Sequence, residues 1–438
     1  MMKAYDQLIR HEGNEDLFRA VEMSIAALVS DYPFHIHVEG LRGTGKTTIL
    51  RAAGSILPPI TRIKSCPYNC DPLSPHCPIH RAMSSEEIKE IGTEVIPRPF
   101  LEISHSAKMG TVVGSIDLQK LTDSTRSEAA LLPGTIPRAH RGIVFIDEIN
   151  RLADVSPEIA DILLDVMGTK PGRIQVEETG LHTAAMPVSV TIWAASNPDE
   201  EPGSLTQIRR QLADRFDFAV NMGRPADSQA IFAILAKAAG LVPTIPVHVG
   251  NMRSVTVDSD FRNLLASIYV DFGLESLRSV EAMEAGMVLS AVLAGRSAID
   301  VADMTRIVPL ALGHRTDAAT IANIIKSIQN TDNSAPQVKE TVENRPGVRT
   351  RMNTEVSTQL KQNWWHSLVE KLQRKLASSR PNRQTSKDSS SQSCSAGGNG
   401  CAAASVPDTV AAPPNKAVPL CQLKTEQYVS SDDNKIQR

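Results

Sequence analysis

A glycine-rich segment, GLRGTGKT at residues 40–47, constrains the fold of this 438-residue chain more than any other feature. The preceding residues Phe34, Ile36 and Val38 alternate with polar residues, which predicts a strand. Residues 46–57 have a helical pattern that two prolines end. A strand, a glycine-rich turn and a helix in this order predict an α/β domain with a doubly wound parallel sheet.

The spacing of this segment fits G-x-x-x-x-G-K-[ST], the pattern of a phosphate-binding P-loop. Gly40, Gly43 and Gly45 lack a Cβ atom, so backbone N–H groups can surround a triphosphate. We expect Lys46 to reach the β- and γ-phosphates and the Thr47 hydroxyl to bind Mg²⁺. The predicted nucleotide-binding residues are Gly40, Leu41, Arg42, Gly43, Thr44, Gly45, Lys46, Thr47 and Thr48.

Two further apolar segments end in polar side chains. Residues 143–146 predict a buried strand that ends at Asp147 and Glu148. We expect Asp147 to hold Mg²⁺ and Glu148 to polarise an attacking water. Residues 188–195 predict another buried strand, and Asn197 beyond it would orient the same water. The alternatives are that the acidic pair caps a helix and that Asn197 belongs to a simple turn.

Two arginines are candidates for stabilising charge on the γ-phosphate. Arg215 lies in QLADRF, and Arg278 lies in GLESLR near the start of a helix. If Arg215 is far from its own phosphate loop, it serves a neighbouring subunit, and that arrangement implies a ring. Arg278 would close over the nucleotide of its own subunit. The alternative for both arginines is a surface salt bridge.

The chain divides into three parts by pattern. Strands and helices alternate over residues 1–225, and residues 226–330 contain only helical patterns, which predicts a lid domain. Residues 331–438 are predicted to be largely disordered because they are rich in Ser, Gly, Ala, Pro and Asn. One amphipathic helix is expected there, at residues 354–378. It would dock a partner protein, contact an anionic membrane or pack against the body.

Charge and hydropathy exclude several classes of protein. Residues 331–438 carry 15 Lys and Arg against 10 Asp and Glu, whereas the first 330 residues carry 31 against 39. An acidic body does not favour a nucleic-acid motor. The sequence shows no secretory signal and no apolar stretch long enough to cross a membrane, so we expect a cytoplasmic protein.

The segments GLRGTGKT, VFIDE, WAASNP, LADRF and GLESLR, in this order, resemble the AAA+ ATPases of the helix-2-insert group. More closely, they resemble the ATPase subunit I family of magnesium chelatase. The segment CPYNCDP at residues 66–72 is similar to one in that family. Residues 112–152 and 172–198 are similar to stretches that carry its β-hairpin inserts. The resemblance covers about residues 10–315.

The resemblance implies an ATPase motor that drives Mg²⁺ insertion into protoporphyrin IX, a step of chlorophyll or bacteriochlorophyll biosynthesis. It implies ATP and Mg²⁺ as ligands and a homo-oligomeric ring. It also implies two partners, a von Willebrand A-type subunit and a large metal-inserting subunit. By the same resemblance, Arg215 and the adjacent Asp214 act across the ring interface, and Arg278 acts within its own subunit. The sequence departs from the family pattern at Ala213 and Arg210.

Other functions are weighed against this one. A MoxR-like chaperone that inserts another metal, or activates another metalloenzyme, shares the same motor motifs. An enhancer-dependent transcription activator needs a GAFTGA loop and a DNA-binding helix-turn-helix, and the sequence contains neither. A scaffold that binds nucleotide without hydrolysis is disfavoured because the catalytic side chains are all present.

Three of the six cysteines are concentrated in one short proline-rich segment. Cys66, Cys70 and Cys77 are followed by His80, and thiolates and imidazole at such spacing suit Zn²⁺ or an iron–sulfur cluster. The spacing lacks the usual C-x₂-C pair. A structural turn with free thiols is therefore the third alternative.

Overall fold

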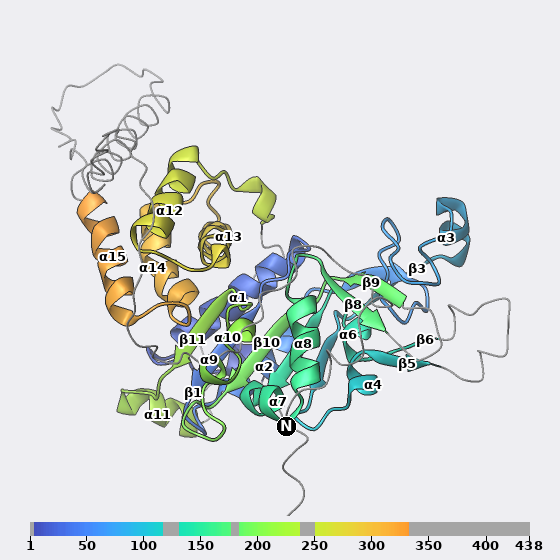
Figure 1. The fold of residues 1–438 in the computed structure, drawn as a ribbon, viewed down its shortest axis with the longest axis horizontal. Helices are drawn as coiled ribbons and strands as arrows, with labels where there is room; N and C mark the ends of the chain where they lie inside the picture. Colours follow the sequence, from blue (N-terminus) through green and yellow to red (C-terminus); the bar gives the residue numbers. More distant parts are fainter. Residues whose placement is uncertain (1–3, 117–130, 177–183, 237–249, 333–438) are drawn as a thin grey trace, which may run out of the picture. The chain divides into compact units, whose positions relative to one another are not determined.

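A computed structural model describes residues 4–116, 131–176, 184–236 and 250–332. The predicted disorder of the tail and its helix at 354–378 lie outside these residues. A five-stranded sheet has the strand order β11-β1-β10-β7-β4, and every neighbouring pair is parallel (Figure 1). Its strands are β1 (Ile36–Gly40), β4 (Phe100–Ile103), β7 (Ile143–Asp147), β10 (Thr191–Ser196) and β11 (Phe218–Met222). The predicted α/β parallel sheet is confirmed.

The two faces of the sheet belong to different apolar clusters. Ile143 and Phe145 join the cluster that also contains residues of helices α1 and α2, whereas Val144 and Ile146 join the cluster of α7 and α8. Successive side chains of a strand point to opposite faces. Because helices cover both faces, the strand has an uninterrupted apolar run. The helices are α1 (Glu15–Val29), α2 (Lys46–Ala53), α7 (Ile149–Val155) and α8 (Pro157–Val166).

In the described part of the chain, three two-stranded antiparallel sheets lie outside the main sheet. Their strands are β2 (Ile60–Ile63) with β3 (Thr93–Ile96), β5 (Gly114–Ile116) with β6 (Leu131–Pro133), and β8 (Gly172–Val176) with β9 (Ala184–Val188). The last two pairs fall in the stretches where the resemblance implied hairpins, and their connecting residues lie outside the described part. The shorter helices of the body are α3 (Ser85–Ile91), α4 (Met109–Val112), α6 (Thr135–Arg138), α9 (Leu205–Ile208) and α10 (Arg210–Ala213), of which the last two follow β10 and contact α7 and α8.

The last helices form the predicted lid, after α11 (Ser228–Leu235). They are α12 (Ser259–Asp271), α13 (Leu277–Leu293), α14 (Val301–Leu312) and α15 (Ala318–Asp332). Helix α13 packs against α1, and α14 packs against β11. Met283, Met287 and Leu289 of α13 are fully buried, as expected for a core helix. Among the described residues, no helix is long and apolar enough to cross a membrane.

Candidate functional site

The phosphate loop joins β1 to α2, as the sequence predicts. Gly43 and Gly45 have φ angles of 78° and 98°, a region that side chains other than glycine rarely adopt. A Cβ atom at Gly40 would lie 2.6 Å from the carbonyl oxygen of Met222, so only glycine fits beside β11. Lys46 Nζ donates hydrogen bonds to the carbonyl oxygens of Gly40 and Leu41, at 2.6 and 2.8 Å. The loop is therefore held in a turn around its own lysine.

The end of β7 faces the start of α2. Thr47 Oγ1 donates to the carboxylate of Asp147, with distances of 3.1 and 3.3 Å to its two oxygens. Arg51 Nη2 lies 3.7 Å from the same carboxylate. A hydroxyl and a carboxylate at hydrogen-bond distance offer the oxygen ligands that Mg²⁺ prefers, and it completes its octahedron with water and phosphate. The residues present therefore fit a magnesium ion delivered with a nucleotide.

Glu148 follows directly and has an unusual backbone conformation. Its φ angle is 56°, in the left-handed region, and it stands at the N-terminus of α7. Its carboxylate is partly exposed, and Glu148 Oε2 lies 3.1 Å from Arg151 Nη1 and 3.8 Å from His105 Nδ1. A strained, non-glycine turn that keeps a carboxylate accessible beside Asp147 suits a group that meets a water molecule.

Asn197 lies just beyond β10, the strand between β1 and β7, so it stands at the same edge of the sheet as the phosphate loop and Asp147. Its side-chain Oδ1 accepts a hydrogen bond from the Asp199 backbone N–H at 3.3 Å. Asn150 of α7 is buried, and its Nδ2 donates to the carbonyl oxygens of Asn197 and Gly203. Sequence reasoning missed Asn150 because a single amide within a helix has no motif.

Ion pairs of Glu200, a residue that sequence reasoning did not single out, connect the phosphate loop to the turn after β10. Arg42 Nε lies 2.8 Å from Glu200 Oε1, and Arg151 Nη2 lies 3.8 Å from the other oxygen of Glu200. Burial lowers the pKa of Lys46, while the charges of Asp147 and Glu200 raise it. Glu200 thus supports the positive charges of the loop. Leu41 and Thr48, both predicted to bind nucleotide, are exposed.

Arg215 and Arg278 belong to a different group of side chains, where the lid meets the body. Arg278 Nη1 donates to Asp214 Oδ2 at 3.3 Å. Burial and the nearby Arg278 charge lower the pKa of Arg215. Within the described residues, the side chain of Arg215 has neither a hydrogen bond nor an ion pair. No hydrogen bond or ion pair in that part of the chain connects either arginine to the phosphate loop.

Asp214 is the centre of this group. It also accepts hydrogen bonds from Ser276 Oγ at 3.0 Å and from Arg315 Nε at 3.0 Å. Arg315 is buried, and its guanidinium also donates to four backbone carbonyl oxygens. These groups line a cavity of about 710 Å³. Sequence reasoning missed Arg315, because it follows α14 in a segment without a recognisable motif.

The four residues of the cysteine-rich segment are also brought together. Cys66, Cys70, Cys77 and His80 are all buried, and each offers one ligand atom within 4.8 Å of the others. This group is separate from the edge of the sheet that holds Asp147.

Comparison with known proteins identifies relatives of both the α/β body and the helical lid. A family model described as "Magnesium chelatase, subunit ChlI" matches residues 9–229, and an "AAA lid domain" model matches residues 262–333. The magnesium-chelatase 38 kDa subunit of Acidiphilium rubrum is 30% identical over 300 residues, which are 63% of this chain and 81% of that protein.

A plant protein and a solved structure are also similar to this chain. Magnesium-chelatase subunit ChlI-2 of Arabidopsis thaliana is 27% identical over 303 residues, covering 64% of this chain and 68% of that protein. The solved structures include a BchI–BchD complex of magnesium chelatase. One of its chains is 24% identical, with a TM-score of 0.40 and coverage of 73% of this chain and 98% of that chain.

Proposed function

Because the chain belongs to the magnesium chelatase ChlI family, we propose that it is the ATP-hydrolysing motor of a magnesium-chelatase-like complex. One observation carries this proposal. The phosphate loop, the Thr47–Asp147 pair, Glu148 and Asn197 all stand at the carboxyl ends of three adjacent parallel strands. In open parallel sheets, this edge is where ligands bind.

Each side chain has a task in phosphoryl transfer. The N–H groups of the loop and Lys46 hold the β- and γ-phosphates, and Lys46 exchanges its two carbonyl partners for phosphate oxygens. Thr47 and Asp147 would hold Mg²⁺, which neutralises phosphate charge when it is bound. Glu148 orients the attacking water and accepts its proton, and Asn197 fixes the position of that water.

The arginines supply the remaining positive charge from a neighbouring copy. Arg215 makes no ion pair within the described residues, and Arg278 shares Asp214 with the buried Arg315. Their position at the joint between lid and body favours joint action on the nucleotide of the next subunit. This differs from the expectation that Arg278 acts within its own subunit. Such head-to-tail contacts close into a ring.

The wider function follows from the family. We propose that ATP hydrolysis in this ring drives Mg²⁺ insertion into protoporphyrin IX in the cytoplasm. A large metal-inserting subunit and a von Willebrand A-type subunit would be its partners. The second candidate is a MoxR-like chaperone for another metalloenzyme. Co-purification from the source organism distinguishes the two functions, because only the first retrieves a large porphyrin-binding subunit.

Phosphate release by the purified chain tests the motor. We expect Lys46→Ala and Glu148→Gln to lower the turnover by at least about 100-fold, because both act on transition-state charge or on the nucleophile. Arg215→Ala should lower turnover equally while nucleotide affinity changes less than about threefold. Arg262→Ala is the control, because Arg262 is exposed and its ion pair with Glu284 lies within the lid. Normal hydrolysis by the Arg215 variant would contradict the ring model.

A further inference from the structure

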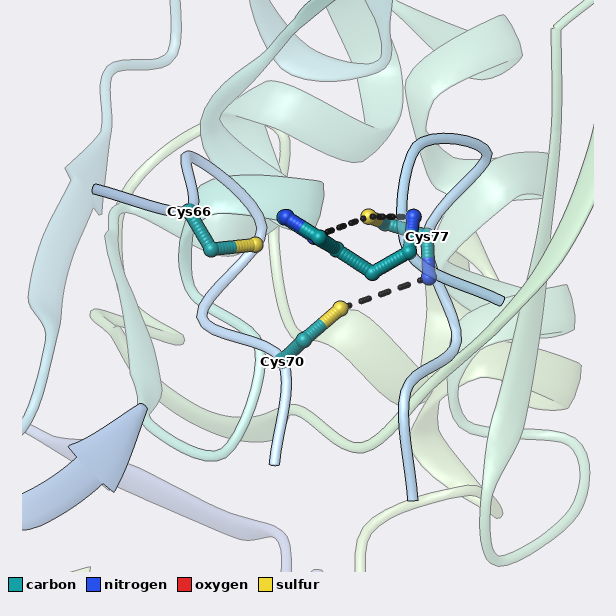
Figure 2. A group of neighbouring side chains, drawn as sticks. Cys66, Cys70 and Cys77 are labelled. Atoms are coloured by element: carbon teal, nitrogen blue, oxygen red, sulfur yellow. Dashed lines mark hydrogen bonds between the residues drawn. The ribbon is translucent and has the colours of Figure 1, made fainter. Parts of the chain in front are cut away.

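The cysteine-rich segment between β2 and α3 forms a closed group of soft ligands. In Figure 2 the sulfur atoms of Cys66, Cys70 and Cys77 point toward a shared space between two stretches of chain. With His80, all four residues are buried, and their ligand atoms lie within 4.8 Å of one another. The three thiols are not joined by disulfides. Three thiols and an imidazole therefore converge in an apolar interior.

Backbone N–H groups also point at these sulfur atoms. The amides of His76 and Cys77 donate to Cys70 Sγ at 3.5 and 3.4 Å, and the amide of His80 donates to Cys77 Sγ at 3.4 Å. The imidazole Nδ1 of His80 lies 3.1 Å from Cys77 Sγ. Hydrogen bonds donated to metal ligands orient those ligands and stabilise negative charge on sulfur. Three such donors would stabilise thiolates at this position.

We propose that Cys66, Cys70, Cys77 and His80 bind one Zn²⁺ ion as a structural site. Three cysteines and one histidine are a known ligand set for structural zinc. Zinc–sulfur bonds of about 2.3 Å in a tetrahedron place the ligand atoms roughly 3.8 Å apart, which agrees with the observed grouping. A four-iron cluster binds its ligands at four separate corners and needs them farther apart. The grouping therefore favours a single ion.

The site is closed, and it lies away from the nucleotide. Asn69 Nδ2 donates to the Arg138 carbonyl oxygen at 2.6 Å, and Asp71 Oδ2 lies 3.0 Å from Arg141 Nη2. These partners precede β7, whose five residues separate them from Asp147 by roughly 15 Å. With four protein ligands, the zinc has no open position for a substrate. Its task is to hold the segment against the amino end of β7.

The surrounding elements show why an ion is needed. Strands β2 and β3 have only four residues each, and Ile88 is the one buried residue of α3. Apart from the thiols, the buried apolar side chains of residues 60–96 are Ile60, Ile63, Tyr68 and Ile88. Zinc binding would add directly to the folding free energy that this small set provides. The proposal is independent of the proposed ATPase function, because it concerns residues at the opposite edge of the sheet.

Metal analysis of the full chain tests this proposal. We expect about one zinc per chain and no acid-labile sulfide, after expression in medium that contains both zinc and iron. Cys70→Ser and Cys77→Ser should lower zinc content at least about tenfold. Cys401→Ser, in the tail, is the matched control and should keep the zinc. Iron bound together with sulfide would overturn the proposal.

A second measurement does not depend on how well the variants fold. The wild-type chain is stripped of metal and titrated with Co²⁺, whose absorption reports tetrahedral thiolate coordination. We expect saturation at about one Co²⁺ per chain and displacement by added Zn²⁺. We also expect zinc to protect three thiols from alkylation. An absence of Co²⁺ bands, with all six cysteines alkylated equally fast in the native chain, would also overturn the proposal.

Discussion

The carboxylate of Asp214 shows how one residue can connect two domains. It accepts hydrogen bonds from Ser276, Arg278 and Arg315, which all belong to the lid, while Asp214 itself follows α10 of the body. The side chain of Arg315 is only 6% exposed. A buried guanidinium requires a negative partner, because removing one member of such a pair leaves an uncompensated charge. Asp214 therefore stabilises the joint and positions Arg278 next to Arg215.

We expect Asp214→Ala to lower the free energy of unfolding by about 3 kcal/mol, because Arg315 then stays buried with only carbonyl partners. Urea denaturation measures the change. Asp161→Ala is the matched control, since Asp161 is 61% exposed and pairs with Arg209 at 3.0 Å. We expect that exposed pair to contribute less than about 1 kcal/mol. Equal losses in the two variants would mean that burial of Arg315 has no energetic consequence.

At this scale the sequence predicted the local backbone of the phosphate loop and the end of β7, whereas the binding roles of these residues remain predictions. Gly43 and Gly45 are required by their φ angles, and Asp147 ends a strand that its apolar run makes recognisable. Arg315 and Asn150 were missed, because their roles depend on groups far away in the sequence. The ion pair between Arg315 and Asp214 spans 101 residues, and no local pattern indicates it.

Two buried histidines lie at the start of β1, an interior strand of the sheet: His35 directly precedes the strand and His37 is its second residue. His35 Nδ1 accepts a hydrogen bond from the Ile192 backbone N–H, and His37 Nε2 lies 2.8 Å from Ser196 Oγ. Burial lowers the pKa of each imidazole from the usual 6.5 to about 3. For His35, the charge of Asp217 opposes this effect in part. Both histidines are therefore neutral in the folded sheet.

This arrangement predicts that the fold loses stability in mild acid. A depressed pKa contributes stability that is complete above pH 6.5, and this contribution is lost as the pH falls toward 3, because only the unfolded chain binds the protons. Each histidine should lower the free energy of unfolding by about 1.4 kcal/mol per pH unit near pH 5.

Urea denaturation at pH 7, 6 and 5 measures this dependence. His37→Gln should reduce the change in unfolding free energy per pH unit by the contribution of one proton. This expectation holds whatever the substitution does to the unfolding free energy at pH 7. Ser106→Ala, an exposed substitution that removes no titrating group, is the control and should leave the slope as it is. A slope unchanged by His37→Gln would show that this histidine does not remain neutral in the folded state.

At the scale of elements, β1, β7, β10 and a helical lid were predicted from their patterns, and the structure confirms them, with α12, α13 and α14 in the lid. The sheet strands β4 and β11 were missed. Strand β4 is four residues long and lies near a proline-rich stretch, while β11 directly follows the DRF segment. Short strands acquire their identity from hydrogen-bonded neighbours rather than from their own sequence. Helix α15 was missed as well.

At the scale of the whole molecule, the division into an α/β body and a helical lid agrees with the two family models, which match residues 9–229 and 262–333. The predicted boundaries at residues 225 and 330 remain predictions. So does the role of the tail, which lies beyond the described residues. The role that the resemblance implies for Arg215, on the nucleotide of a neighbouring copy, is likewise still a prediction.

A mixing experiment tests whether the active site is shared between copies. Arg215→Ala retains a complete phosphate loop and Glu148, whereas Glu148→Gln retains Arg215. In a mixed ring, an Arg215→Ala subunit that lies next to a Glu148→Gln subunit has a complete catalytic site, because its neighbour supplies the missing arginine. Random mixing of equal amounts should then restore about a quarter of wild-type turnover from two inactive proteins. Phosphate release, measured as a function of the mixing ratio, should be highest at equal amounts.

The outcome depends on which subunit supplies each residue. One side of the site provides the phosphate loop and Glu148, the other side provides Arg215, and each variant lacks a residue from a different side. If Arg215 acted within its own subunit, every subunit would lack one essential group, and no mixture would hydrolyse ATP. Lys46→Ala mixed with Glu148→Gln is the control for the same reason. Both of those residues belong to the same half of the site, so their mixture should stay inactive at every ratio. Activity in that control would mean that Lys46 of one subunit and Glu148 of another act on the same nucleotide. The head-to-tail ring does not allow this, because it takes both residues of a site from one subunit.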